Sequence, residues 1–174
     1  MQEPPNALSS LLGVLIGFRM VEVALVYDLT KAYQSIATGE IERNVRIIVW
    51  RWGDTGADWE IYGYNVVTFG DQVAGLVLEL VKGLAADLGE SLDAEASYQI
   101  RRKTYVDDGA GGGSPDQVAR FRGNCVDGLY DGTIAKILTL VNLKPKVMVA
   151  SGDKDPASLE ILGDKVLGHF WKPT

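Results

Sequence analysis

The hydrophobic positions of the chain follow a helical period in two stretches. Between Asn6 and Met20, apolar side chains recur at the three- and four-residue spacing of an amphipathic helix, at Leu8, Leu11, Leu12, Leu15 and Ile16. From Asp71 to Gly89 the spacing is more regular, with one face formed by Val73, Val77, Leu80, Val81, Leu84 and Leu88. Asp is a common N-cap and Gly commonly ends a helix. We therefore predict two helices, and the apolar face of the second is expected to pack against the core.

Runs of β-branched and aromatic residues predict the strands. Residues 21–27 form such a run and deliver Asp28 at its carboxyl end. Residues 46–52 and 59–67 predict a hairpin, because turn-forming residues separate them. Residues 97–106 lead into Asp107-Asp108-Gly109, where the Asp-Gly pair predicts an exposed turn. The glycines of residues 109–113 are expected to form a mobile loop rather than a strand.

The remaining patterns complete an irregular alternation of helices and strands. They predict a short helix at residues 34–36, helices at 115–123 after the Ser114 cap and at 133–141, and a strand at 146–150. This order favours an α+β fold with an antiparallel sheet and helices packed on one face. A length of 174 residues with 47% hydrophobic content suits one domain spanning residues 1–174.

Composition excludes several classes of protein. Arg19 and Glu22 interrupt the longest apolar stretch, so we expect no membrane span. Residues 1–5 carry no basic region, which argues against a secretory signal and favours an intracellular chain. The single cysteine, Cys125, and the single histidine, His169, provide neither a disulfide nor a zinc ligand set. We expect Cys125 to be a small core or loop residue and His169 to pack beside Trp171.

The net charge of −6 and the pI of about 4.8 are unusual for a protein that binds nucleic acid. Phosphate contacts need Lys and Arg, so this acidity is the strongest argument against such a function. Basic residues do gather locally, at residues 43–46, 101–103 and 144–146. Carboxylates of a metal site also count as negative only until a cation binds.

The candidate chemistry lies in three carboxylates. Asp107 and Asp108 are adjacent, and most such pairs in turns are merely solvated. Asp28, at a strand end, supplies a third carboxylate that can face them. Oxygen ligands of this kind suit Mg²⁺ or Mn²⁺ together with substrate phosphates. Phosphoryl transfer and metal-dependent hydrolysis are both compatible with these residues, whereas a P-loop at residues 109–113 lacks its Lys-Ser or Lys-Thr.

The sequence around these carboxylates resembles a known family. Asp28-Leu29-Thr30-Lys31-Ala32-Tyr33 and Tyr105-Val106-Asp107-Asp108 look like motifs A and C of reverse transcriptases. The order of the other blocks resembles the polymerase of BEL/Pao-type LTR retrotransposons, from about Asn6 to Pro173. These blocks are Phe18-Arg19, Trp50-Arg51, residues 66–70, residues 143–146 and residues 167–173.

The resemblance implies a polymerase-palm-like fold and a metal site. The domain would be a single, partial reverse transcriptase domain, mainly palm, with fingers and thumb truncated. Asp28 and Asp107 would bridge two Mg²⁺ or Mn²⁺ ions, with Asp108 in a supporting role. Lys146 would neutralise or protonate the leaving pyrophosphate, and Lys144 is a possible substitute.

The same resemblance assigns the substrate contacts. Tyr33 would exclude the 2′-hydroxyl of ribonucleotides, and Phe69 and Gly70 would lie against the incoming base and template. Tyr105 and Val106 would line the primer end, although both could equally be core residues. Leu167, Gly168 and Trp171 resemble the hairpin that grips the primer.

The expected function is RNA-directed DNA polymerisation. Nucleotides from dNTPs would be transferred to a primer 3′-hydroxyl on an RNA or DNA template, in a cytoplasmic particle or the nucleus. The parent transposable element would also encode RNase H and integrase domains. The alternative is an inactive or domesticated fragment that acts as a non-catalytic binding module.

Overall fold

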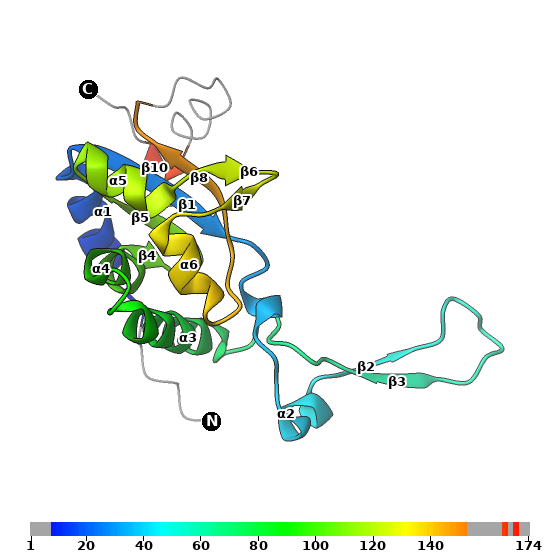
Figure 1. Cartoon of the computed structure of the whole chain (residues 1–174). Coiled ribbons are helices and arrows are strands. Elements are labelled where there is room, and N and C mark those ends of the chain that lie inside the picture. The colour runs from blue at the N-terminus through cyan, green and yellow to red at the C-terminus, as the bar shows by residue number, and fades with distance from the viewer. Residues whose placement is uncertain (1–7, 153–164, 167–168, 171–174) are drawn as a thin grey trace.

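The protein has an α+β fold built on a four-stranded antiparallel sheet, as its sequence predicts (Figure 1). The computed structural model describes residues 8–152 and two short paired strands, β9 (Lys165–Val166) and β10 (His169–Phe170). Within these residues, no helix combines the length and apolar character needed to cross a membrane.

The central strand of the sheet is β1 (Val23–Leu29). It pairs on one side with β5 (Asp108–Gly113) and on the other with β8 (Pro145–Ala150), and β4 (Thr104–Tyr105) borders β5. A strand with neighbours on both sides can be buried on both faces. The apolar run of β1 therefore suits its central position.

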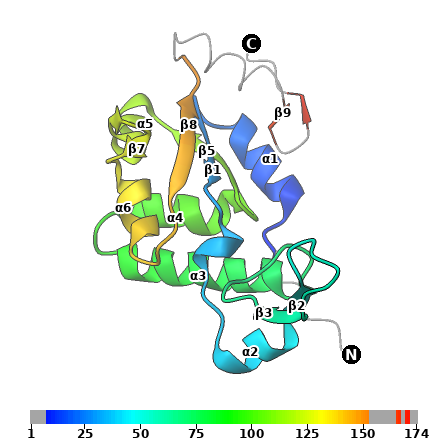
Figure 2. The ribbon, with the colours of Figure 1, turned by 90° about the vertical axis from the view of Figure 1, so that its right-hand side faces the viewer.

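Helices cover the two faces of the sheet unequally (Figure 2). One face, which carries Leu25, Tyr27 and Leu29, packs in the main core with α3 (Ala74–Gly89), α4 (Ala94–Arg102), α5 (Pro115–Arg122) and α6 (Thr133–Thr139). On the other face, the one described helix that packs is α1 (Leu11–Arg19), whose Val14 and Phe18 contact Ala24 and Ala110. Alternation along β1 places Asp28 on this less covered face.

Helix α3 confirms the predicted helix but not its predicted buried face. Its buried residues are Ala74, Leu78, Lys82, Ala85, Ala86 and Gly89, whereas Val73, Leu80, Leu84 and Leu88 are exposed. Small residues face the neighbouring helices because these approach closely: a Cβ on Gly89 would lie 2.5 Å from the Ile137 side chain. Gly89 is thus a packing position, and Asp71 bonds the Thr68 N–H and hydroxyl instead of capping the helix.

The glycine-rich stretch after the acidic pair is a strand, so the predicted mobile loop is wrong. In β5 the absent side chains make room for neighbours, since a Cβ on Gly109 would lie 2.3 Å from the Tyr27 ring. A Cβ on Gly112, which has φ +142°, would lie 2.1 Å from the Val23 carbonyl oxygen. Glycine is required here by close approach and backbone conformation, not by flexibility.

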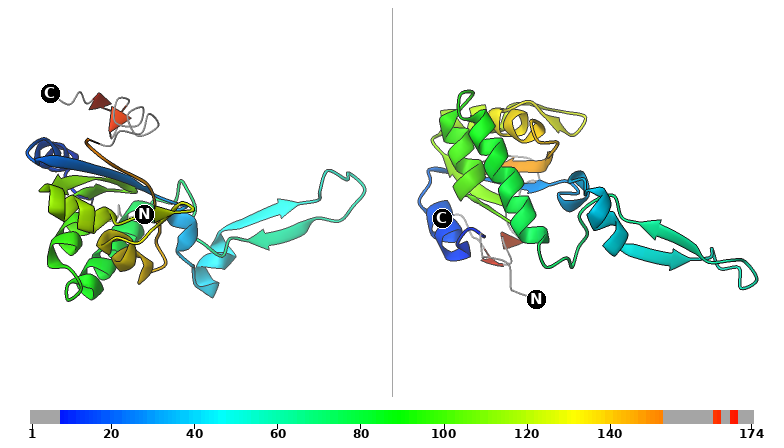
Figure 3. Two further views of the ribbon diagram at one scale, coloured as in Figure 1. Left: turned by 45° about the horizontal axis from the view of Figure 1, so that its top comes forward. Right: turned by 90° about the horizontal axis from the view of Figure 1, so that it is seen from below.

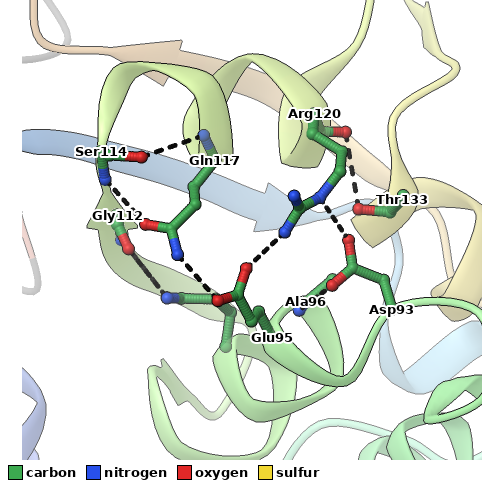
Figure 4. Close-up of polar contacts among 9 residues, drawn as sticks. Asp93, Glu95, Ala96, Gly112, Ser114, Gln117, Arg120 and Thr133 are labelled. Carbon is green, nitrogen blue, oxygen red and sulfur yellow. Dashed lines mark hydrogen bonds and ion pairs between the residues drawn. The ribbon is translucent and has the colours of Figure 1, made fainter.

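Polar contacts join β5, α4 and α5 (Figure 4). Ser114 and Gln117 form the capping box that begins α5, where the sequence predicts a cap. Arg120 of α5 bonds both Asp93, the N-cap of α4, and Glu95. The two helices are thereby fixed next to the glycine strand.

A two-stranded ribbon projects from the body of the molecule (Figure 3). It consists of β2 (Ile47–Trp50) and β3 (Glu60–Gly63), confirming the predicted hairpin, and is preceded by η1 (Tyr33–Ser35) and α2 (Glu40–Val45). Every residue of β2 and β3 is exposed. A smaller hairpin pairs β6 (Cys125–Val126) with β7 (Leu129–Tyr130), and Cys125 is exposed there rather than in the core.

Candidate acidic site

The sheet brings the three predicted carboxylate residues to neighbouring backbone positions. Asp28 of β1 lies directly opposite Asp108 of β5 in the antiparallel register. Asp107 precedes Asp108, and its carbonyl oxygen accepts a hydrogen bond from the Leu29 N–H at 3.0 Å. Residues 28, 107 and 108, far apart in sequence, therefore meet at one end of the sheet.

The turn that presents the acidic pair differs from the predicted one. Tyr105 pairs with Asp108, so the two turn residues are Val106 and Asp107, and the Asp-Gly pair is not at its centre. Both acids are partly buried rather than exposed. Val106 has φ +54°, an uncommon conformation for a β-branched residue that marks local strain.

Lys146 reaches the site through an irregularity in β8. The pairing of β1 with β8 shifts register between Val26 and Asp28, next to Val147, which has φ +50°. Such bulges redirect side chains near functional sites. Here the shift sets Lys146 opposite Asp28, and the two form an ion pair of 2.9 Å. The pKa of Lys146 is raised, first by its hydrogen bond with Asp28 and then by the Asp28 charge.

Like charges and burial act together on Asp108. Burial raises the pKa of its carboxyl, and the charges of Asp107 and Asp28 raise it further, to about 6. The charges of Asp28 and Asp107 therefore both act on the Asp108 carboxyl. A cation bound there would offset these charges.

The site fits a divalent cation in its donor chemistry, because carboxylate oxygens are the ligands that Mg²⁺ and Mn²⁺ prefer. The side chains are not arranged as a finished metal site. Among the described residues, no three or more His, Cys, Asp or Glu side chains form a group that could hold a metal ion. The Asp28 carboxylate instead pairs with the Lys146 ammonium.

An aromatic pair borders the acidic residues. Tyr33 of η1 meets Phe69 edge to face, with 5.0 Å between ring centroids. Burial raises the pKa of Tyr33, and the charges of Asp107 and Glu79 raise it further, which places the phenol within the field of the acidic turn. Phe69 is 70% exposed. Gly70 has φ +89° and open space where a side chain would lie, so its conformation rather than crowding favours glycine.

One residue of the site was missed by sequence reasoning. Lys82 of α3 is 1% exposed and donates a hydrogen bond of 2.7 Å to the carbonyl oxygen of Val106. Its ammonium also pairs with Glu79 at 2.6 Å. The apolar stripe of α3 gave no indication that Lys82 is buried. The residues that could have indicated it are Leu78, Ala85 and Ala86, which lie three and four positions away and share its buried helix face.

Tyr105, Lys144 and the predicted primer grip are the remaining site residues that the sequence predicts. Tyr105 is partly buried in β4, and Lys144 is exposed while its carbonyl oxygen accepts from the Thr30 N–H at 2.9 Å. Leu167, Gly168 and Trp171, the predicted primer grip, lie outside the described residues, as does the contact of His169 with Trp171.

No family model matches this chain, and no curated protein matches it.

Proposed function

We propose that the chain is the palm of an RNA-directed DNA polymerase of the BEL/Pao retrotransposon type. The observation that carries the proposal is the pairing of Asp28 with Asp108 across antiparallel strands, with Asp107 in the adjoining turn. This supports the motif resemblance, because two motifs distant in sequence contribute to one acidic site.

The chain's own residues supply positioning and charge. Asp28, Asp107 and Asp108 would hold two Mg²⁺ or Mn²⁺ ions, which when bound lower the pKa of an attacking hydroxyl and stabilise the charge of phosphoryl transfer. Lys146 holds a proton beside Asp28 and is exposed, so its ammonium is free to move from the carboxylate to a phosphate. Such catalysis depends on positioning and electrostatics, so loss of one principal ligand is expected to abolish turnover.

The substrate is proposed to be a deoxynucleoside triphosphate bound beside a primer on an RNA or DNA template. Tyr33 supports this, because its ring lies edge to face with Phe69 and its phenol is within reach of the Asp107 charge. A fixed aromatic ring next to the acidic turn can exclude a 2′-hydroxyl. Replacing Tyr33 with Ala is expected to relax discrimination against ribonucleotides while leaving cation binding intact.

A non-catalytic binding module is the second candidate, and one observation favours it. The Asp28–Lys146 ion pair satisfies a carboxylate that a working metal site needs, and the described side chains form no ready metal-binding group. A domesticated fragment that keeps the fold but not the chemistry would retain such an arrangement. It would bind no divalent cation at the acidic residues.

Calorimetric titration with Mn²⁺ tests the proposal on this chain. We expect saturable binding that is lost in Asp107→Asn and kept in Asp116→Asn, which removes the same charge from an exposed position in the first turn of α5. Mg²⁺-dependent primer extension with dNTPs, also lost in Asp107→Asn, is the functional readout. No Mn²⁺ binding, or extension that survives Asp107→Asn, would reject the polymerase; phosphatase activity with the same sensitivity would point to a hydrolase.

A further inference from the structure

The turn that carries Asp107 needs support from outside the hairpin. Its strand β4 has only two residues, and the turn residue Val106 adopts a left-handed conformation that β-branched residues disfavour. A short hairpin with a strained turn is not stable by itself. Something else must hold the carbonyl groups of this segment in place.

Lys82 makes the required contacts. Its ammonium donates to the carbonyl oxygen of Val106 at 2.7 Å and lies 3.5 Å from that of Thr104, so it reaches residues on both sides of Tyr105. It also forms the ion pair with Glu79, one helical turn earlier in α3. A buried lysine is costly unless it is paired and hydrogen-bonded, and the contacts with Glu79, Val106 and Thr104 offset that cost here.

We infer that Lys82 is a positioning residue: from the body of α3 it fixes the left-handed turn at Val106 and so sets where Asp107 and Asp108 stand. The long side chain spans from the helix to the turn, and its charge strengthens bonds to carbonyl groups. Lys82 would not touch the substrate or a metal. Its effect on cation binding rests on the proposed function, but its effect on the turn does not.

The loss of this support has a direct consequence for the turn. Without the ammonium, the carbonyl groups of Val106 and Thr104 lose their donor and Val106 is free to leave its disfavoured conformation. The Leu29 N–H, which bonds the Asp107 carbonyl oxygen, then becomes accessible more often. A hydrogen bond to a charged group is strong enough to change that exchange rate about tenfold or more.

The test compares the double variant Lys82→Met, Glu79→Gln with the native chain. The double change removes the donor without leaving a buried carboxylate unpaired. We expect NMR to show the three-bond amide–Hα coupling of Val106 moving toward its extended-strand value, and amide exchange at Leu29 to accelerate about tenfold or more. Affinity for Mn²⁺, measured by calorimetry, should fall in parallel.

Two single variants serve as controls. Glu79→Gln keeps Lys82 and a side-chain oxygen for it, so the turn should remain unchanged. Ile137→Val lowers stability in the buried part of α6 and removes no hydrogen-bond donor to the turn, so it should change neither the Val106 coupling nor the Mn²⁺ affinity. A general loss of stability would affect all three variants alike.

The outcomes separate this inference from the proposed function. An unchanged turn in the double variant overturns the role of Lys82. If the native chain binds Mn²⁺, an altered turn with unaltered Mn²⁺ affinity overturns the part of the inference that links the turn to the position of Asp107 and Asp108. An altered turn in a chain whose native form binds no Mn²⁺ keeps the structural role and rejects the metal site. Should the double variant not fold, ¹⁵N NMR of the native Lys82 ammonium decides: protons protected from solvent exchange are expected, and freely exchanging protons overturn the inference.

Discussion

Gly112 shows how much one missing side chain matters in this sheet. The central strand β1 and the strand β5 pair closely only because no Cβ stands between Gly112 and the Val23 carbonyl group. Its φ of +142° is also one that side chains rarely allow. Steric room and backbone freedom are thus required at the same residue.

Replacing this glycine tests whether crowding fixes the strand. Gly112→Ala should lower the free energy of unfolding by more than about 2 kcal/mol, because the new methyl group meets backbone atoms that cannot rotate away. Gly83→Ala is the matched control: it lies inside α3 with nothing nearer than 4.0 Å to an added Cβ, and should gain about 0.5 to 1 kcal/mol. Urea unfolding of both variants measures the difference, and equal effects would contradict the explanation.

Asp93 is a second residue with a measurable role. Its carboxylate caps α4 by accepting from the Ala96 N–H at 3.0 Å, and it pairs with Arg120 at 2.8 Å. Burial by itself would raise the pKa of Asp93. The bonds to Ala96, Arg120 and Thr133 outweigh burial, so the pKa is lowered overall.

This lowered pKa predicts how stability depends on pH. The native pKa lies below the unfolded value of about 4, so Asp93 stabilises the fold above pH ~4 and loses that contribution as pH falls through the native pKa. Asp93→Asn keeps a capping oxygen but cannot ionise. Its deficit, about 1 kcal/mol near neutral pH, should shrink in urea titrations as the pH falls below ~4, whereas a deficit that does not change with pH in that range would argue against the charged cap.

At the level of elements, the ribbon of β2 and β3 has apolar residues but no buried position. The apolar and aromatic residues of β2 and the turn-forming residues that follow it predict the hairpin, yet every residue of both strands is exposed. Contacts near the ribbon's loop are local: Arg51 stacks on Trp59 at 4.4 Å and donates to the Thr55 carbonyl oxygen. The ribbon therefore has little support from the body of the molecule.

The ribbon is expected to open before the rest of the described fold. Two-stranded hairpins are marginally stable alone, and regions with few buried contacts unfold locally at low cost. Among the described basic residues, trypsin should cut first after Arg51, well before Arg101 or Arg102 at the end of α4, as followed by mass spectrometry. Arg51→Gln should remove that early fragment. Equally rapid cutting at Arg101 would show that the ribbon is as stable as the body.

Local chemistry made some elements predictable and others not. The cap at Ser114, the helix predicted at residues 133–141 and the strand predicted at residues 146–150 follow from short-range patterns. The structure confirms them, with the helix at Thr133–Thr139 and the strand at Pro145–Ala150. The buried face of α3 was not predictable from local patterns. An apolar stripe does not reveal that neighbouring helices require alanine and glycine for close approach. The strand character of β5 was missed for the same reason, since its crowding comes from β1 and α4.

Across the whole molecule, the candidate site was predictable in composition but not in detail. The motif resemblance named Asp28, Asp107 and Asp108, and the register of β1 with β5 brings them together. The turn geometry, the β8 register shift that sets Lys146 against Asp28, and the burial of Lys82 depend on contacts between distant segments. Sequence periodicity carries no information on such contacts.

The net charge of −6 gives a last prediction about the whole molecule. A protein that binds nucleic acid only through Lys and Arg is weakened by Mg²⁺, since the cation competes for phosphates. A carboxylate site that shares a cation with phosphate is strengthened by it. For this acidic chain we expect weak primer–template binding, weaker than about 1 μM at physiological salt, that improves when Mg²⁺ replaces NaCl at equal ionic strength. Fluorescence anisotropy of a labelled duplex measures both effects.

The sign of the Mg²⁺ effect is decisive because the two modes of binding respond in opposite directions. Asp107→Asn should abolish the improvement, while Asp116→Asn, with the same charge change on the exposed first turn of α5, should keep it. If Mg²⁺ weakened binding in the native chain, contacts between nucleic acid and surface basic residues would account for the affinity. The acidic residues at the end of β1 and β5 would then have no part in recognising phosphate.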